Sequence, residues 1–366
     1  MSNKLIIASA GSGKTQHIVD SAIDNVKHGE SVLITTYTEA CEREIREKLI
    51  VACGGAIPSL ITVQTWFSFL IQHGAKPYQL SSITGDIKGM LLVNGTSATY
   101  VGERGNPRKH YLTSDGKIYS DKLAKFVIRC DEESNGKVVN RISRCFDNIY
   151  IDEVQDLAGY DLEILRALFK SDSDVVLVGD PRQATYSTNN NAKNKKFKKA
   201  EILHFFADDK LEIDTDDKSL TVNYRCSEAI CDFSNALYPD MPPASSGNEK
   251  ITGHDGIFLV EEGVVDSYLK EFNPVQLRDS KKTEVNEHYS VFNFGKSKGL
   301  TFDRVLIYPT APVVKWLKDN SSDLTAVGRS RLYVGLTRAR SSVGIVLKRK
   351  DIASIDVGAI YQPNEI

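Results

Sequence analysis

Residues 11–15, with the sequence GSGKT, have the types and spacing that bind a phosphorylated nucleotide. An apolar run precedes them and apolar residues at helical spacing follow, so they are expected between a strand and a helix. Glycine lets backbone N–H groups approach phosphate, and a helix start carries partial positive charge. We expect Lys14 to bridge the β- and γ-phosphates of ATP and Thr15 to bind Mg²⁺. The expected nucleotide-binding residues are Ala10, Gly11, Ser12, Gly13, Lys14, Thr15 and Gln16.

Two adjacent carboxylates, Asp152 and Glu153, end a second apolar run, residues 148–152. We expect Asp152 to hold Mg²⁺ through water and Glu153 to activate the attacking water as a general base. Such carboxylates also occur as solvated loop charges, but the upstream GSGKT segment favours a metal site. Together the two segments predict ATP hydrolysis with Mg²⁺ as the metal cofactor.

The elements that must position these residues form an α/β pattern. Short apolar runs alternate with helical stretches, which predicts parallel sheets covered on both faces. The expected strands are residues 5–8, 31–35, 148–152, 174–178, 220–222, 256–260, 289–294, 304–308 and 342–347. Helices are expected at residues 18–26, 39–49, 227–236 and 330–340. Residues 72–145 have weak periodicity and are interpreted as an insertion, and residues 237–255 as a surface linker.

Bulk composition narrows the class of protein. The 366 residues are 26% charged with a formal net charge of −2, so nucleic-acid binding would need a local patch or groove. No run of about 18 apolar residues exists, which argues against a membrane partner. The six cysteines are scattered without a CxxC pair, as is typical of reduced thiols in a cytoplasmic protein. No structural metal site is indicated.

GSGKT followed by DEVQD at residues 152–156 resembles the UvrD/Rep branch of the superfamily 1 helicases. The family's other motifs follow in order across nearly the whole chain. They are residues 35–40 (TTYTEA), 62–69 (TVQTWFSF), 179–186 (GDPRQATY), 220–225 (LTVNYR), 298–303 (KGLTFD) and 332–340 (LYVGLTRAR). One such match is weak evidence, whereas eight in order are specific.

The resemblance implies two tandem RecA-like domains of the P-loop NTPase class, with ATP in the cleft between them. The domains are expected at residues 1–210, with a reduced insertion at about 72–145, and at residues 211–366. In the family, Gln183 senses the γ-phosphate. The second half must supply a cation to that phosphate, and Arg225 and Arg338 are the candidates; a surface role is the alternative for each.

The resemblance also implies a path for single-stranded DNA over both domains. Such strands are held by aromatic stacking and backbone contacts. The expected nucleic-acid-binding residues are Thr36, Tyr37, Thr65, Trp66, Tyr186 and Lys298. A buried core role is the alternative for Trp66 and for the neighbouring Phe67. The basic run 193–199 is either a solvated face or a phosphate contact.

The sequence also departs from the family pattern. Ser187 follows Tyr186 where an aromatic residue is usual, Thr301 and Gly295 replace an acidic residue and a histidine, and no adenine-reading glutamine precedes residue 5. We predict an ATP-dependent 3′–5′ DNA helicase or translocase acting on single-stranded or tailed duplex DNA, in repair or replication. The alternative is a DNA-stimulated ATPase subunit that binds a nuclease or replication factor, in a replication or defence complex. A P-loop kinase and an inactive scaffold are less compatible with the motifs.

Overall fold

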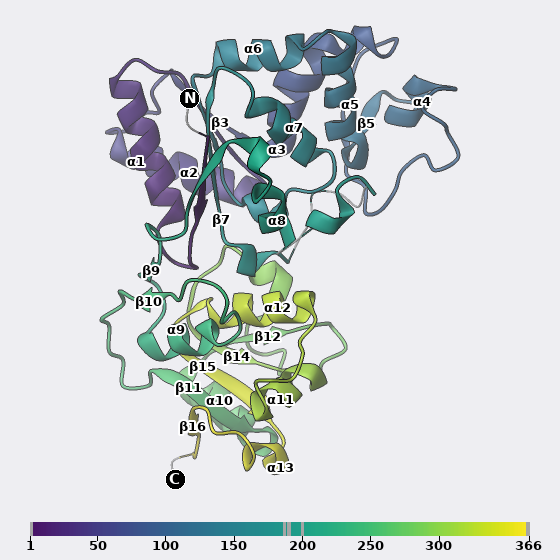
Figure 1. Cartoon of the computed structure of the whole chain (residues 1–366). Helices are drawn as coiled ribbons and strands as arrows, with labels where there is room; N and C mark the ends of the chain where they lie inside the picture. The colour runs from purple at the N-terminus through teal and green to yellow at the C-terminus, as the bar shows by residue number, and fades with distance from the viewer. Residues whose placement is uncertain (1–2, 186–187, 189–191, 199–200, 364–366) are drawn as a thin grey trace. The chain divides into compact units, whose positions relative to one another are not determined.

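The computed structural model describes residues 3–185, 188, 192–198 and 201–363, and its contacts divide the chain into two compact units (Figure 1). Unit 1 comprises Met1–Ile7, Lys14–Pro181 and Tyr186–Asp216. Unit 2 comprises Ala8–Gly13, Arg182–Thr185 and Asp217–Ile366. The chain therefore passes from one unit to the other inside the GSGKT segment and again beside Gln183. The expected division at residues 210 and 211 stays a prediction.

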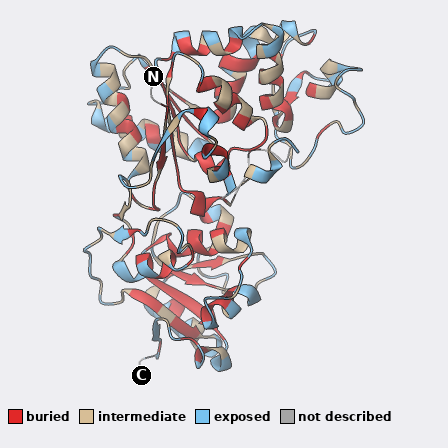
Figure 2. Cartoon of the chain, in the orientation of Figure 1, coloured by how far each residue is buried: buried red, intermediate tan, exposed pale blue. Residues whose placement is uncertain are grey.

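Unit 1 is built on a six-stranded, all-parallel sheet with the strand order β3-β2-β6-β7-β1-β8. Its central strands are almost continuously apolar because both faces are covered, and they are buried (Figure 2). Helices α1 (Lys14–Lys27) and α2 (Glu39–Ala52) lie on one face and α7 (Asp161–Leu168) on the other (Figure 1). The strands are β1 Asn3–Ile7, β2 Val32–Thr36, β3 Ile61–Thr65, β6 Asn148–Ile151, β7 Asp174–Gly179 and β8 Ile213–Asp216.

Some helices of unit 1 begin at a side-chain cap that the sequence supplies. Thr38 accepts a hydrogen bond from the N–H of Cys41 at the start of α2, and Thr65 accepts one from Ser68 at the start of α3. The α-helices are α1 Lys14–Lys27, α2 Glu39–Ala52, α3 Trp66–Phe69, α4 Pro107–Tyr111, α5 Ser120–Glu133, α6 Lys137–Cys145, α7 Asp161–Leu168 and α8 Ile202–Phe206. A π-helix, Leu70–Ala75, and a 3₁₀-helix, Lys76–Ser81, continue the chain from α3. Further 3₁₀ turns occupy Val154–Asp156, Pro181–Gln183, Lys195–Phe197 and Asp209–Leu211.

Residues 72–145 contain more structure than their weak periodicity suggests. They include a small parallel pair, β4 Gly89–Leu91 and β5 Lys117–Tyr119, and then helices α5 and α6. Helix α5 buries Leu123 and Phe126 in the main core of the unit, and each contributes roughly 1.5–3 kcal/mol relative to exposure. This segment therefore contributes to the hydrophobic core that packs against the sheet.

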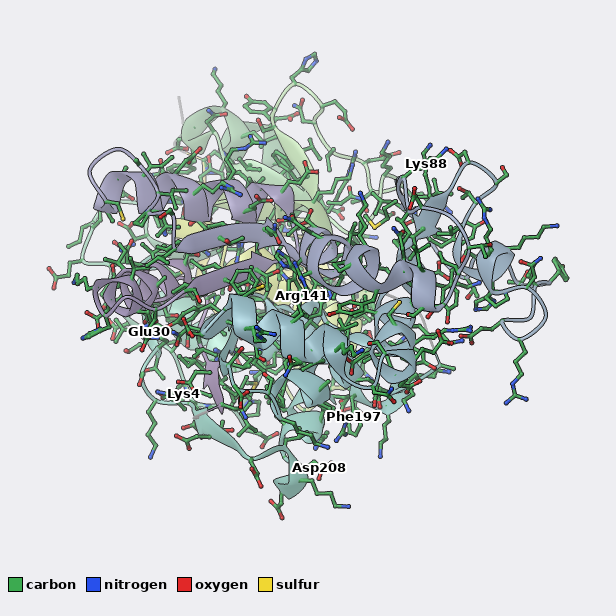
Figure 3. All side chains as sticks on the ribbon, turned by 90° about the horizontal axis from the view of Figure 1, so that it is seen from above. Lys4, Glu30, Lys88, Arg141, Phe197 and Asp208 are labelled. Atoms are coloured by element: carbon green, nitrogen blue, oxygen red, sulfur yellow. The ribbon has the colours of Figure 1, made fainter. Side chains whose placement is uncertain are left out.

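The basic run that follows β7 is partly anchored. Phe197, labelled in Figure 3, packs edge-on against the ring of Phe205 at 5.6 Å between centroids. The amide of Asn194 donates hydrogen bonds to the carbonyl of Gly159 and to the carboxylate of Glu163. The aromatic and amide members of this run thus hold it to unit 1.

Unit 2 contains a second six-stranded parallel sheet, with the order β13-β12-β14-β15-β11-β16. Its strands are β11 Gly256–Glu261, β12 Val275–Arg278, β13 Val291–Asn293, β14 Phe302–Ile307, β15 Ala339–Leu347 and β16 Ala359–Ile360. A separate parallel pair joins β9 Val222–Asn223 to β10 Ser245–Ser246. The helices are α9 Glu228–Asn235, α10 Val265–Phe272, α11 Ala311–Lys318, α12 Ala326–Leu336 and α13 Arg349–Ile352, with 3₁₀ turns at Glu262–Val264 and Phe294–Ser297.

Three sequence-based expectations for unit 2 need correction. The helix expected to reach residue 340 ends at Leu336, and β15 begins at Ala339. Strand β12 is not among the expected strands; its polar Gln276 is fully buried and bonds with Tyr308 and the backbone of Asn286. The expected linker 237–255 is partly internal, since it contains β10 and buries Ala244.

Within the described ranges, no helix is long and apolar enough to cross a bilayer.

Candidate nucleotide site

The phosphate-binding segment begins directly after β1 and ends at the first turn of α1. Gly11 and Gly13 have φ values of +69° and +83°, which L-residues with a side chain rarely adopt. A Cβ on Gly11 would lie 2.3 Å from the Oδ1 atom of Asn223, whereas one on Gly13 would meet nothing within 4 Å. The two glycines therefore serve different needs: Gly11 also permits a close approach to the strand that precedes Arg225.

The two predicted carboxylates lie at the end of β6, and only β7 separates β6 from β1. Asp152 is 5% exposed and accepts a hydrogen bond from the backbone N–H of Glu153 at 2.9 Å. Glu153 is partly exposed and has φ of +56°, an uncommon value for a residue other than glycine. Strained backbone of this kind occurs often at functional sites, and here it turns the chain sharply after the strand.

Burial, followed by the negative charge of Glu153, raises the pKa of Asp152 to about 7, although the charge of Lys14 acts in the opposite direction. A cation at this carboxylate would favour its ionised form. Mg²⁺ prefers oxygen ligands and keeps several positions for water and phosphate, and the Asp152 carboxylate and Thr15 hydroxyl are such ligands. Among the described residues there is no group of three or more His, Cys, Asp or Glu side chains able to hold a metal. The donor set therefore fits Mg²⁺ bound jointly by protein and nucleotide.

Gln155 is a site residue that motif reading passed over. It is fully buried, its side-chain N–H donates to the carboxylate of Glu153, and its Oε1 accepts from the backbone N–H of Asp180 at 3.1 Å. A Cβ on Gly179 would come within 2.4 Å of that Oε1 atom. Gln155 thus ties the candidate base to the end of β7. The DEVQD motif contains this glutamine, but only the structure shows its contacts.

The structure brings together the predicted γ-phosphate sensor and the predicted arginines, all within unit 2. Arg338 is 2% exposed and donates from Nη2 to Oε1 of Gln183 at 3.0 Å. Its other nitrogens donate to the carbonyls of Val334 and Leu300. Arg225 donates to the carbonyl of Thr337 at 3.0 Å. The surface role considered for Arg338 is therefore excluded in this structure.

Arg182 is a further residue that the sequence did not single out. It is 3% exposed and donates from Nη2 to the carbonyl of Ala8 at 3.3 Å and to the hydroxyl of Ser9 at 3.1 Å. Its guanidinium also lies 5.2 Å from the ring centre of Tyr333. Tyr333 in turn accepts a long hydrogen bond, 3.5 Å, from the N–H of Ala10. These contacts fix the first half of the phosphate-binding segment.

The predicted nucleic-acid residues separate into three groups. Tyr37 and Phe67 are partly exposed and meet edge-to-face with centroids 5.8 Å apart. Trp66 is 1% exposed and bonds through Nε1 to Asp161, so the stacking role expected for it does not agree with its position, and the core alternative holds. Its helical neighbour Phe67 takes the exposed position because consecutive helical residues point in different directions.

The other predicted contacts have varied surroundings. Thr65 caps α3, and Thr36 is 1% exposed with a hydroxyl that finds no hydrogen-bond partner among the described residues. Lys298 is half-buried in unit 2. Tyr186 lies outside the described residues.

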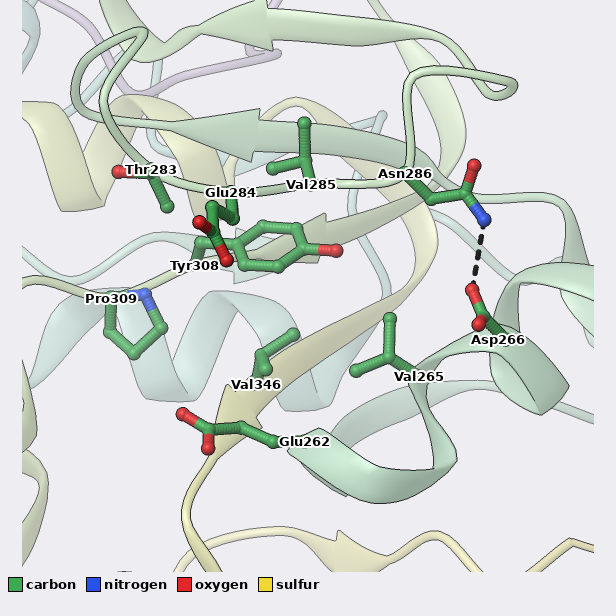
Figure 4. Close-up of a pocket in the computed structure, with 10 residues that line it drawn as sticks. All are labelled: Glu262, Val265, Asp266, Thr283, Glu284, Val285, Asn286, Tyr308, Pro309 and Val346. Atoms are coloured by element: carbon green, nitrogen blue, oxygen red, sulfur yellow. Dashed lines mark hydrogen bonds between the residues drawn. The ribbon is translucent and has the colours of Figure 1, made fainter.

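A cavity of about 780 Å³ in unit 2 has a different character (Figure 4). It lies at the carboxyl ends of β11, β14 and β15, and Glu262, Asp266 and Glu284 line it without any lysine or arginine. Asp266 accepts a hydrogen bond from Asn286, as Figure 4 shows. Such a lining repels phosphate, so this cavity is not the nucleotide site.

The fold and the glycine-rich segment define a P-loop NTPase. Two family models match the chain: the AAA domain at residues 1–189 and the viral superfamily 1 RNA helicase core domain at residues 108–347. The chain belongs to the superfamily 1 helicases, a class of ATP-hydrolysing enzymes.

Similar curated proteins match over short stretches. An ATP-dependent helicase/nuclease subunit from Enterococcus faecalis is 51% identical over 53 residues, covering 14% of this chain and 4% of that protein. The RecBCD enzyme subunit RecB of Borreliella burgdorferi is 30% identical over 103 residues, covering 28% of this chain and 8% of that protein. The chain therefore matches less than a tenth of the length of either relative.

Among solved structures, a complex of Arterivirus nonstructural protein 10 (helicase) with DNA is similar at a TM-score of 0.48 and 16% identity. The similarity covers 94% of this chain and 60% of that one.

Proposed function

We propose that this chain is an ATP-driven motor that moves along single-stranded DNA, in the 3′–5′ direction that the family resemblance implies, and separates tailed duplexes. The observation that carries the proposal is the shared edge of the unit 1 sheet. The start of α1 follows β1, and the Asp152–Glu153 turn follows β6, with only β7 between these two strands. The charge of Lys14 acts on Asp152.

In this proposal the residues divide the chemistry of hydrolysis. Lys14 and the backbone N–H groups of residues 10–13 bind the phosphates. Thr15 and Asp152 would hold Mg²⁺, which would neutralise phosphate charge when bound. Glu153 accepts a proton from the attacking water, and Gln155 fixes the orientation of its carboxylate. Gln183 and Arg338, already hydrogen-bonded, act on the γ-phosphate with Arg225. That ATP lies in a cleft shared by both domains stays a prediction.

The proposed DNA contact in unit 1 is centred on Tyr37 and Phe67. Partly exposed aromatic rings supply base stacking worth about 1–3 kcal/mol per base. The hydroxyl and backbone groups around Thr36 and Thr65 lie in the same segments, at the ends of β2 and β3. Because β2 and β3 are adjacent and parallel, these segments meet at one edge of the sheet.

The test is ATP hydrolysis by the purified chain with and without single-stranded DNA. We expect DNA to stimulate hydrolysis, and Glu153→Gln to lower kcat by about 10²–10⁴-fold while ATP still binds. Glu132→Gln, at an exposed glutamate of the same unit, is the matched control. Unwinding is then compared on 3′-tailed and 5′-tailed duplexes. Hydrolysis that is indifferent to DNA would contradict the motor, and preference for a 5′ tail would reverse the direction.

A second candidate is a DNA-stimulated ATPase subunit that works inside a larger assembly with little unwinding of its own. The names of the curated relatives favour it, since both describe subunits of enzymes that combine several parts. DNA-stimulated hydrolysis without strand separation on any tail would support this candidate over the stand-alone motor.

A further inference from the structure

Asp161 is a buried carboxylate that the proposed chemistry does not use. It is 1% exposed at the start of α7 and accepts a hydrogen bond from the indole Nε1 of Trp66 at 2.8 Å. Its second oxygen accepts from the hydroxyl of Thr188 and, at 3.4 Å, from the backbone N–H of Ala158. All four residues belong to unit 1.

Trp66, Ala158 and Thr188, which donate to Asp161, come from separate segments. Trp66 is the first residue of α3, and the next residue is Phe67, which contacts Tyr37. Ala158 lies in the turn that follows Glu153 and Gln155. Thr188 follows the Gln183 segment, and its backbone N–H also donates to the carbonyl of Asp156 at 2.8 Å. One carboxylate therefore joins the aromatic surface, the turn after the candidate base and the segment after the phosphate sensor.

A buried carboxylate is a costly way to fill a core. Removing it from water is unfavourable unless good hydrogen bonds replace those lost, and an apolar residue would pack at this place without that cost. What the carboxylate adds is direction: its oxygens fix the indole N–H and the hydroxyl at defined angles. The Trp66 ring also packs on Phe69 of the same helix, with the ring centroids 5.5 Å apart, so the indole is held against α3.

We propose that Asp161 is a positioning residue that couples nucleic-acid binding at the Tyr37–Phe67 surface to the turn carrying Glu153. The inference rests on the proposed function. A base stacking on Phe67 displaces α3, and the Trp66–Asp161 hydrogen bond passes that displacement to α7 and to the turn at residues 153–158. Gln155 is bonded to the Glu153 carboxylate, the candidate general base, and then holds that carboxylate in its working orientation.

The first experiment measures ATP hydrolysis during a titration with single-stranded DNA. Asp161→Asn and Thr188→Val should lower the stimulation by DNA at least about fivefold, while hydrolysis without DNA and the KM for ATP change less than about twofold. Asp147→Asn is the matched control, because Asp147 also joins two segments, through bonds of 2.7 Å to Ser31, but at the other end of the strands. Equal stimulation in wild type and both variants would overturn the inference.

A second experiment does not depend on DNA. Trp66 and Trp316 are the two tryptophans of the chain, so Trp316→Phe leaves Trp66 as the one indole reporter. Adding Mg–ADP or a non-hydrolysable ATP analogue should shift its emission, and Asp161→Asn should abolish the shift. No shift in the parent, or an equal shift in the variant, would overturn the inference.

The two experiments separate the inference from the proposed function. If DNA does not stimulate wild type but the Trp66 emission responds to nucleotide only with Asp161 present, the link stands and the motor proposal fails. If DNA stimulates wild type and Asp161→Asn alike, the motor proposal stands and the link fails. Thr188→Val carries the test if Asp161→Asn does not fold.

Discussion

The two sheets carry their candidate functional residues at opposite ends of their strands. In unit 1 these residues follow the strands: Lys14 comes after β1, Tyr37 after β2 and Asp152 after β6. In the six-stranded sheet of unit 2 they precede the strands: Lys298 comes before β14 and Arg338 immediately before β15, whereas Arg225 follows β9 of the separate pair. The rule that parallel α/β sheets bind ligands at the carboxyl ends of their strands therefore describes unit 1 and fails for unit 2.

The carboxyl end of the unit 2 sheet shows what that rule would have selected. It holds the cavity lined by Glu262, Asp266 and Glu284, which has the wrong charge for a nucleotide. The difference teaches that a repeated architecture does not repeat a site, because the side chains at each edge decide what binds there. The following predictions test this comparison, beginning with the largest expected effect.

At the functional end of the unit 2 sheet, Arg338→Lys should lower kcat for ATP hydrolysis by about 10³-fold. Lysine keeps the charge but cannot serve the carbonyls of Val334 and Leu300 and the amide of Gln183 together. Steady-state kinetics measure the effect. Arg340→Lys is the control, since Arg340 is exposed and pairs with Asp303 at the surface. An equal loss of activity in both variants would contradict a specific role of Arg338 in hydrolysis.

At the phosphate-binding segment, Gly11→Ala should raise the KM for ATP at least about tenfold, since a backbone strain of roughly 1–3 kcal/mol adds to the clash with Asn223. Gly253→Ala, at φ of +84° with no atom within 4 Å of the added Cβ, carries the strain without the clash. Calorimetric measurement of nucleotide affinity separates the effect of the strain from the effect of the clash. Normal affinity in Gly11→Ala would mean that Asn223 gives way.

The pH dependence of stability tests the buried surroundings of His254 in unit 2. It stacks between Phe258 and Phe272, with centroids 3.8 and 3.6 Å away, and bonds with the hydroxyl of Tyr268. Burial, followed by the charge of Arg304, lowers the pKa of His254 to about 4. Against an unfolded pKa of about 6.5, its contribution to stability is complete above pH 6.5 and is lost as pH falls towards 4. The Tm of wild type should therefore fall more steeply from pH 7 to 5 than that of His254→Phe. Parallel Tm curves would contradict this assignment.

The smallest effect is expected at the acidic cavity. Glu262→Gln and Glu284→Gln should change kcat and KM for ATP by less than about twofold, because these charges lie at the opposite end of β15 from Arg338 and are screened. The same kinetic assay applies. A larger change would show that the carboxyl end of the unit 2 sheet takes part in nucleotide binding and would erase the contrast between the two sheets.

Much of the first sheet and its chemistry could be predicted, because local patterns report local structure. The apolar runs at residues 148–152 and 174–178 match β6 and β7 within a residue at each end. The site was harder in places where side chains from distant segments meet. Trp66 and Phe67 are adjacent aromatic residues, and nothing in their types says which one faces the core. Strand β12 escaped prediction because its buried Gln276 is satisfied by partners 10 and 32 residues away.

The sequence by itself determined the glycine-rich GSGKT segment, the paired carboxylates and the helicase family, since each depends on residue types at short fixed spacing. Tertiary structure alone decided that Gln155 holds Glu153, that Arg182 holds the phosphate-binding segment and that Asp161 joins three segments. The physical reason is that a buried polar side chain must find partners wherever the fold brings them, and those partners lie up to 174 residues away along the chain.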